Sequence, residues 1–136
     1  MKKEWSGRWS SSVQPRKQRK FRANAPLHVL RRFISSSLSP ALRERYKRRS
    51  MPVRTGDEVR VMRGSKKNLK GLVERVDLKA GKIYIDSMKT KKTDGSEIHT
   101  PIDPSNIQIT VLNLDDKMRL KSVAKAEKEA EKQGKS

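Results

Sequence analysis

The stretch from Asp57 to Asp77 constrains the fold more than any other part of the sequence; it reads DEVRVMRGSKKNLKGLVERVD. Apolar residues alternate with polar ones at its start, and Gly64 then breaks the pattern. A basic loop continues to Gly71, after which an apolar strand pattern resumes. Strand patterns on both sides of a glycine-bounded loop predict a tight β-hairpin. Its cationic tip is a surface suited to binding phosphates.

Further period-two patterns predict a small, mainly β domain over residues 51–114. The spacing of Val73 and Val76 predicts a bulge or a strong twist, and Pro101 places its strand at a sheet edge. Four to five short strands separated by Gly and Pro turns favour a small closed sheet or barrel. The expected core consists of Val59, Val61, Val73, Val76, Ile83, Ile85, Ile98, Ile102, Ile107, Ile109 and Val111.

The formal net charge is +19, and most of it lies in the first third of the chain. Residues 1–50 hold 15 Lys and Arg against two acidic residues, whereas residues 51–115 hold 12 against nine. A free globular domain with such an excess repels itself, so the excess indicates a polyanionic partner. Residues 1–50 are therefore interpreted as a basic extension that binds a polyanion.

Two short helices are expected within this extension, after an irregular start over residues 1–25. The first begins near Pro26, and the run of serines from Ser35 to Ser37 ends it. The second has Ser39 as its N-cap and Pro40 at its first position. A third, charged helix is expected over residues 115–136, where two aspartates favour the helix N-terminus electrostatically.

Catalysis and metal binding are not expected. The chain has no cysteine, and its two histidines, His28 and His99, lie far apart in the sequence. The glycines at 64 and 71 do not fit a phosphate-binding loop of nucleotide hydrolases. No run of 18 apolar residues exists, which argues against membrane insertion. We expect no enzymatic activity, cofactor or small-molecule substrate, and we expect cross-strand pairs for Asp57, Glu58, Asp77 and Asp86.

Other interpretations of the basic segments remain open. The extension also has features of a nuclear address, a membrane-surface segment or an organellar transit peptide. Repeated Ser and Pro interrupt a continuous amphipathic helix, which disfavours the membrane interpretation. The loop before Gly71 can also be a solvated hairpin tip, although the absence of a Cβ there permits close approach of another backbone. Trp5 and Trp9 are equally compatible with stacking on bases and with disorder.

The chain resembles the archaeal and eukaryotic form of a universal large-subunit ribosomal protein that carries a KOW motif. The matching stretches are PRKQRKFRANAPLH (Pro15–His28), LSPALRERY (Leu38–Tyr46), RSMPVRTGDEVRVMRGSKKNLKGLVERVD (Arg49–Asp77) and IDPSNIQITVLNLD (Ile102–Asp115). Transcription elongation factors also carry KOW motifs, but the combination of stretches is specific. Residues 1–12 precede the usual start of the family, and the loop at 65–69 lacks a further glycine.

The resemblance implies an SH3-like barrel in the cytoplasmic ribosome that binds large-subunit rRNA near the peptide exit region and supports early subunit assembly. Neighbouring large-subunit proteins are further expected partners. The implied KOW-loop contacts are Arg63, Ser65, Lys66, Lys67 and Lys70, and the implied extension contacts are Arg16, Lys17, Arg19, Lys20, His28, Arg31 and Arg32. Charge alone adds further candidates, three of them in a second basic loop at residues 89–93: Arg22, Arg43, Arg45, Lys47, Arg48, Arg49, Lys89, Lys91 and Lys92.

Two rival functions are compatible with the charge. A KOW-type transcription or RNA-processing factor would need a second domain to contact polymerase, for which the 136-residue chain has no room. A DNA-compacting protein would prefer duplex DNA over folded RNA. The favoured hypothesis is a structural rRNA-binding protein in which Lys and Arg neutralise phosphates and release counterions.

Overall fold

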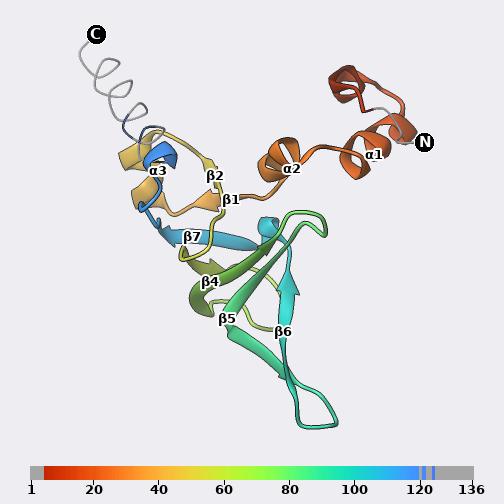
Figure 1. Ribbon diagram of the computed structural model, residues 1–136. Helices are drawn as coiled ribbons and strands as arrows, with labels where there is room; N and C mark the ends of the chain where they lie inside the picture. The colour runs from red at the N-terminus through yellow and green to blue at the C-terminus, as the bar shows by residue number, and fades with distance from the viewer. Residues whose placement is uncertain (1–4, 120, 122–123, 125–136) are drawn as a thin grey trace.

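The computed structural model describes residues 5–119, 121 and 124 (Figure 1). The N-terminal helices lie to one side of a sheet, and the last hairpin extends away from it. The elements are η1 (Gly7–Ser11), α1 (Pro15–Ala23), α2 (Leu27–Phe33), β1 (Ser35–Leu38), α3 (Pro40–Tyr46), β2 (Ser50–Pro52), β3 (Glu58–Val61), β4 (Lys70–Asp77), β5 (Lys82–Lys91), β6 (Glu97–Ile102), η2 (Pro104–Asn106) and β7 (Ile107–Val111).

The protein is mainly β, with one mixed sheet of seven strands in the order β2-β1-β7-β3-β4-β5-β6. Neighbouring strands are antiparallel except for β1 and β7, which run parallel. Among the described residues no ladder joins β2 to β6, so the sheet is open by its hydrogen bonds and not closed as expected. The sheet is mixed because β1, which precedes the hairpins in the sequence, pairs in parallel with β7, the last strand.

The five strands of the hairpin region, β3 to β7, confirm the period-two patterns. The ladder between β4 and β5 shifts its register between Val73 and Arg75, which confirms the predicted bulge. The strand with Pro101, β6, lies at the edge of the sheet, as expected from the missing N–H donor. The periodic aliphatic residues therefore indicated both the number and the order of these strands along the chain.

The pattern did not indicate β1 and β2. The serine run does end α2, but it then continues as β1 between β2 and β7. Ser36 is buried, and its hydroxyl donates a hydrogen bond of 2.7 Å to the carbonyl of Pro104. A buried hydroxyl is tolerated when it has a hydrogen-bond partner. Ser36 can therefore be buried on β1 although the strand does not alternate apolar and polar residues.

One hydrophobic core joins the extension to the hairpin region. Eight of the eleven expected residues are buried, and Val76 is partly buried against them. The remaining two, Ile98 on the edge strand β6 and Val111 at the end of β7, are exposed and were wrongly assigned to the core. Residues that the periodicity did not indicate complete the core: Ile34, Leu38, Tyr46, Met51, Val53, Met88 and Leu112. The basic extension is therefore partly built into the folded domain.

The N-terminal segment is more ordered than expected. Residues 15–23 form α1 with Pro15 at its start, so the expectation of an irregular segment is wrong there. Phe21 on this helix stacks on Trp5 with ring centroids 5.2 Å apart, and it meets the edge of Phe33 at 6.1 Å. The indole N–H of Trp5 donates to the Phe21 carbonyl at 3.0 Å. These aromatic contacts give α1 partners outside the helix, although no residue of α1 is itself buried.

Both helices expected after residue 25 are present as α2 and α3. Pro26 precedes α2 as its N-cap, whereas Pro40 takes the first turn of α3 after Ser39. The charged helix expected over residues 115–136 lies largely outside the described residues. Within the described part, residues 117–119 are helical, and the Met118 N–H donates to the carboxylate of Asp116 at 2.8 Å.

Candidate nucleic-acid interface

The loop between β3 and β4 is held by its own backbone and by one arginine. Gly64 and Asn68 adopt positive φ angles of 96° and 72°, which turn the chain. The Asn68 N–H donates to the Val61 carbonyl at 2.8 Å, and its side-chain oxygen accepts from Arg60 Nη2 at 2.7 Å. This bracing fixes the direction of the loop, on which Arg63, Ser65, Lys67 and Lys70 are exposed.

Lys66 connects this loop to the second basic segment. Its ammonium donates to the Lys89 carbonyl on β5 at 3.0 Å, and Lys66 is half-buried. The second segment is largely strand and not the loop that was expected, because Lys89 and Lys91 pair with His99 and Glu97 of β6. Lys66 of the loop and Lys89 of β5 therefore lie beside each other, and the Lys89 ammonium also lies 3.7 Å from a carboxylate oxygen of Glu97.

Gly71 lies on β4 where no side chain fits. A Cβ there would overlap with Ser87 Oγ and would lie 2.5 Å from Asp86 Oδ1 and 2.6 Å from Ile85 Cγ2. The close approach expected at this glycine is therefore made by side chains of β5, of which Ile85 is fully buried. The glycine allows β4 and β5 to pack closely below the basic loop.

Replacing Gly71 with alanine is expected to lower the free energy of unfolding by about 1–3 kcal/mol, because the methyl group overpacks the contact with Ile85. Denaturant titration measures the change. Gly7→Ala is the matched control, since its Cβ would meet only Trp5 at 3.9 Å and the glycine does not have a positive φ. Equal effects of the two substitutions would contradict the close packing at Gly71.

The candidate cations of the extension lie on three helices and the segment after them. Several of them also make contacts within the protein; the Lys20 ammonium lies 4.8 Å from the Trp9 ring centroid, and the Arg22 guanidinium lies 5.8 Å from that of Phe33. Arg43 Nε donates to the Leu38 carbonyl at 2.8 Å, and the Arg45 guanidinium lies 5.1 Å from the Tyr46 ring centroid. Lys47 ends α3 with a φ of 48°. Of all the candidate RNA-binding residues, only Lys66 is not exposed.

Several carboxylates accept hydrogen bonds from groups within the protein. Asp77 accepts from the N–H groups of Lys79 and Ala80 in the β4–β5 turn, each at 3.0 Å. Asp86 accepts from the Leu72 N–H at 3.0 Å. Hydrogen bonds from the hydroxyl and N–H of Ser96 lower the pKa of Asp94. Asp77 nevertheless lies opposite Lys82 across the β4–β5 ladder, as expected, whereas the cross-strand pair expected for Asp57 is wrong because Asp57 precedes β3 and pairs with Arg119.

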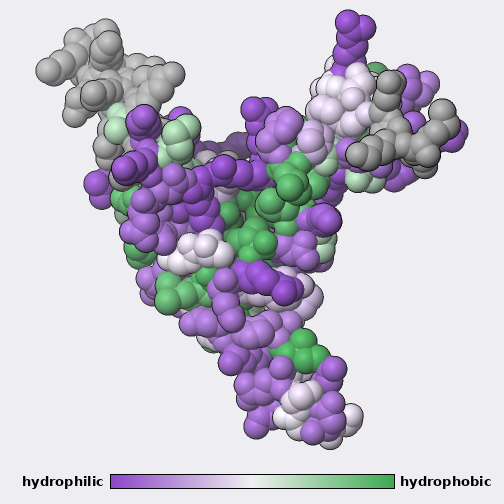
Figure 2. Space-filling model, in the orientation of Figure 1, coloured by the Kyte–Doolittle hydropathy of each residue, from purple (hydrophilic) through white to green (hydrophobic). Residues whose placement is uncertain are grey.

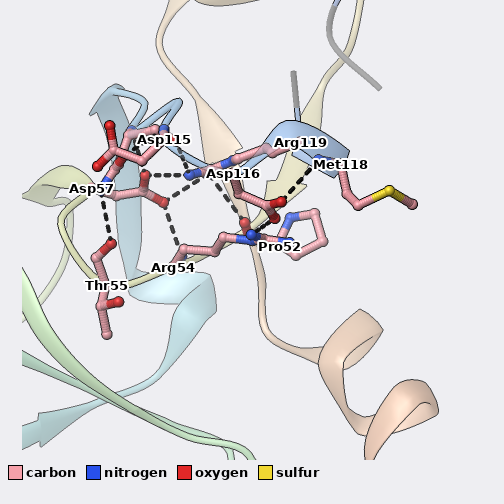
Figure 3. Close-up of polar contacts among 9 residues, drawn as sticks. Pro52, Arg54, Thr55, Asp57, Asp115, Asp116, Met118 and Arg119 are labelled. Carbon is pink, nitrogen blue, oxygen red and sulfur yellow. Dashed lines mark hydrogen bonds and ion pairs between the residues drawn. The ribbon is translucent and has the colours of Figure 1, made fainter. Parts of the chain in front are cut away.

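The sequence patterns did not indicate the buried ion pair between Asp57 and Arg119 (Figure 3). Arg119 donates to the two carboxylate oxygens at 2.6 and 2.8 Å, and it also donates to the carbonyls of Asn113 at 2.8 Å and Pro52 at 3.3 Å. Asp57 further accepts from the N–H groups of Arg54 and Asn113. This network anchors the C-terminal segment.

The described residues contain no group of three or more His, Asp or Glu side chains arranged to hold a metal ion. His28 is exposed on α2, whereas His99 Nδ1 lies 3.2 Å from a carboxylate oxygen of Glu74. Within residues 5–119, 121 and 124, no helix combines the length and the apolar composition that a membrane span requires.

Comparison with known proteins assigns the chain to a family. The model of the family of ribosomal proteins called L26 in eukaryotes and L24 in archaea matches residues 12–126. The large ribosomal subunit protein uL24 of Methanothrix thermoacetophila is 51% identical over 110 residues, which cover 81% of this chain and 95% of the relative. The protein of the same name from Methanosarcina barkeri is 49% identical over 114 residues, covering 84% and 98% respectively.

A third uL24 protein, from Methanocorpusculum labreanum, is 48% identical over 110 residues that cover 81% of this chain and 91% of its own length. These matches extend over both the basic extension and the hairpin region. The chain therefore belongs to the family of eukaryotic L26 and archaeal L24-type ribosomal proteins, whose role is structural and not enzymatic.

Proposed function

We propose that this chain is a structural component of the large subunit of the cytoplasmic ribosome. It binds large-subunit rRNA near the peptide exit region, contacts neighbouring ribosomal proteins and supports early subunit assembly. The names of its uL24 relatives support the assignment to the large subunit. The proposed location near the peptide exit region and the proposed role in assembly rest on the family resemblance.

The observation that carries the proposal is the separation of charges. Cationic candidates on α1, α2, α3, the β3–β4 loop and β5 are exposed, with only Lys66 half-buried. Several carboxylates, by contrast, are engaged by internal donors, as in the Asp57–Arg119 pair and the Asp77 turn. Phosphate groups of RNA are therefore the natural counterions of the exposed cations.

We further propose that β3 to β7 curl into an SH3-like barrel around the shared core, although their hydrogen bonds form an open sheet. Residues of β5 and β7, such as Ile85 and Ile109, are fully buried in the same cluster, which supports this arrangement. The barrel fixes the orientation of the β3–β4 loop, and the extension contacts RNA helices through shape and phosphates more than through base sequence.

Loss of two loop lysines is expected to weaken the salt dependence of RNA binding. The double variant Lys67→Ala, Lys70→Ala removes two exposed cations, so the slope of log K against log[salt] falls in magnitude by up to about 1.8. The measurement is filter binding to deproteinised large-subunit rRNA over a range of salt concentrations. Lys66 is left in place because it also bonds to the Lys89 carbonyl.

The matched control for this experiment is Lys117→Ala, Lys121→Ala, which changes the net charge equally at exposed positions of the C-terminal segment. If both double variants change the slope equally, net charge and not the loop determines binding. Sedimentation through a high-salt sucrose gradient tests the wider proposal, because the chain is expected to migrate with the large subunit. Tighter binding to duplex DNA than to folded rRNA would instead favour a compacting protein.

A further inference from the structure

A hollow of about 1160 Å³ lies between α1, α2 and the β4–β5 turn. We call it the α1–α2 groove. Figure 2 shows a hydrophobic band in this region, bordered by hydrophilic residues. Residues from three separate parts of the chain line it, including Phe21 on α1, Leu27, Leu30 and Phe33 on α2, and Leu78 in the turn. Tertiary packing brings the three α2 residues together with Phe21 and Leu78.

Part of the apolar lining of the groove faces solvent. Phe33 is 41% exposed and Leu27 is 57% exposed. The ring of Phe33 is held in place, because Phe21 meets it edge to face and the Arg22 guanidinium lies 5.8 Å from its centroid. A fixed, accessible aromatic ring is a platform on which a flat apolar group can stack.

Charge distinguishes the possible occupants of the groove. Three cationic residues, Arg19, Arg22 and Lys79, line it, and no Asp or Glu is found among its lining residues in the described part of the chain. An apolar protein segment would account for the exposed Phe33 and Leu27 but would not need a wholly cationic border. A nucleotide has both an apolar base face and an anionic phosphate, so it matches the floor and the border together.

We propose that the α1–α2 groove binds unpaired nucleotides of rRNA. A base stacks on Phe33, while flanking phosphates contact Arg19, Arg22 and Lys79. The hollow is large for a single small ligand and accommodates more than one nucleotide. This inference rests on the proposed rRNA-binding function and adds to it a specific pocket that selects single-stranded RNA, next to the phosphate contacts made by the β3–β4 loop.

Phe33→Leu tests the pocket, since it removes the aromatic ring and keeps an apolar side chain. Affinity for large-subunit rRNA transcribed from Methanothrix thermoacetophila, the source of a relative 51% identical, is expected to fall about 5- to 100-fold. The salt slope is expected to stay unchanged because no phosphate contact is lost. Chemical probing of ribose 2′-hydroxyls should show a few unpaired nucleotides protected by the original protein and released by the variant.

Tyr84→Leu is the matched control. The Arg75 guanidinium lies 4.3 Å from the Tyr84 ring centroid, so this ring also has a cation–π contact, but Tyr84 does not line the groove. This variant is expected to keep the affinity and the protected nucleotides. Circular dichroism melting checks that both variants fold. The proposal is overturned if Phe33→Leu binds the rRNA with an affinity within about twofold of the original protein and protects the same nucleotides.

A photo-crosslinking amino acid in place of Phe33 identifies the occupant in assembled subunits. A crosslink to rRNA supports the proposal, whereas a crosslink to a neighbouring protein overturns it. Failure of the proposed rRNA-binding function would give a different result, because the original protein would then bind the rRNA transcript no more tightly than it binds duplex DNA. If the original protein binds the rRNA and this binding depends on Lys67 and Lys70 but not on Phe33, only the proposed role of the groove is refuted, and the rRNA-binding function stands.

Discussion

Arg119→Met is expected to lower the free energy of unfolding by about 3–5 kcal/mol, measured by urea titration. The carboxylate of Asp57 is fully buried, and Arg119 is only 4% exposed. Without the guanidinium, the donors that Asp57 keeps among the described residues are the backbone N–H groups of Arg54 and Asn113, at 2.9 and 2.8 Å. The large effect therefore comes from a buried charge that has lost its partner, more than from lost packing.

A nearby, more exposed ion pair provides the control. Arg54 and Asp116 also form an ion pair, but their side chains are 26% and 32% exposed. Arg54→Met is therefore expected to cost about 1 kcal/mol or less, because water screens such a pair. Combining Asp57→Asn with Arg119→Met should cost less than the sum of the single changes. If Arg119→Met costs no more than Arg54→Met, the ion pair contributes no more than a surface pair.

The position of this pair explains why its loss affects the whole domain. Arg119 joins the Pro52 carbonyl on β2, the Asn113 carbonyl after β7 and the carboxylate just before β3. Three segments distant in the sequence thus meet at one guanidinium. The pair was not predictable from the sequence, because Asp57 and Arg119 are 62 residues apart and both types of residue are normally exposed.

Strands that bury one face were predictable, and those that depend on neighbours were not. Val59 and Val61 alternate with polar residues, so β3 could be located, and the spacing of Val73 and Val76 located the bulge in β4. The serines of β1 carry no such signal, because their burial depends on β2, β7 and the Pro104 carbonyl. Local periodicity reports burial only where the buried side chains are apolar.

Helix α1 and the groove illustrate the same limit. The basic run after Pro15 has no apolar stripe, yet Phe21 gains partners in Trp5 and Phe33 from neighbouring segments. The cationic β3–β4 loop was predictable because its residues are contiguous in the sequence. The α1–α2 groove was not, because Phe33 and Leu78 come together only after the β4–β5 turn packs near α2.

Leu38→Ala is expected to lower the free energy of unfolding by about 2–5 kcal/mol. Leu38 is fully buried on β1, where its N–H donates to the Arg49 carbonyl at 3.1 Å and where β7 pairs with it on the other side. Removing its side chain leaves a cavity between the extension and the hairpin region. Denaturant titration of the RNA-free protein measures the effect.

Leu72→Ala makes the same chemical change on β4 and is the matched control, because Leu72 is 51% exposed and leaves no cavity. Its expected cost is about 1 kcal/mol or less. A large difference between the two leucines means that residues 35–38 fold with the sheet before any RNA is bound. The cations of α2 and α3, which flank β1, are then held in place by a folded core, so rRNA binding orders less chain and loses less conformational entropy. Equal, small effects of both substitutions would instead mean that β1 joins the sheet only on RNA.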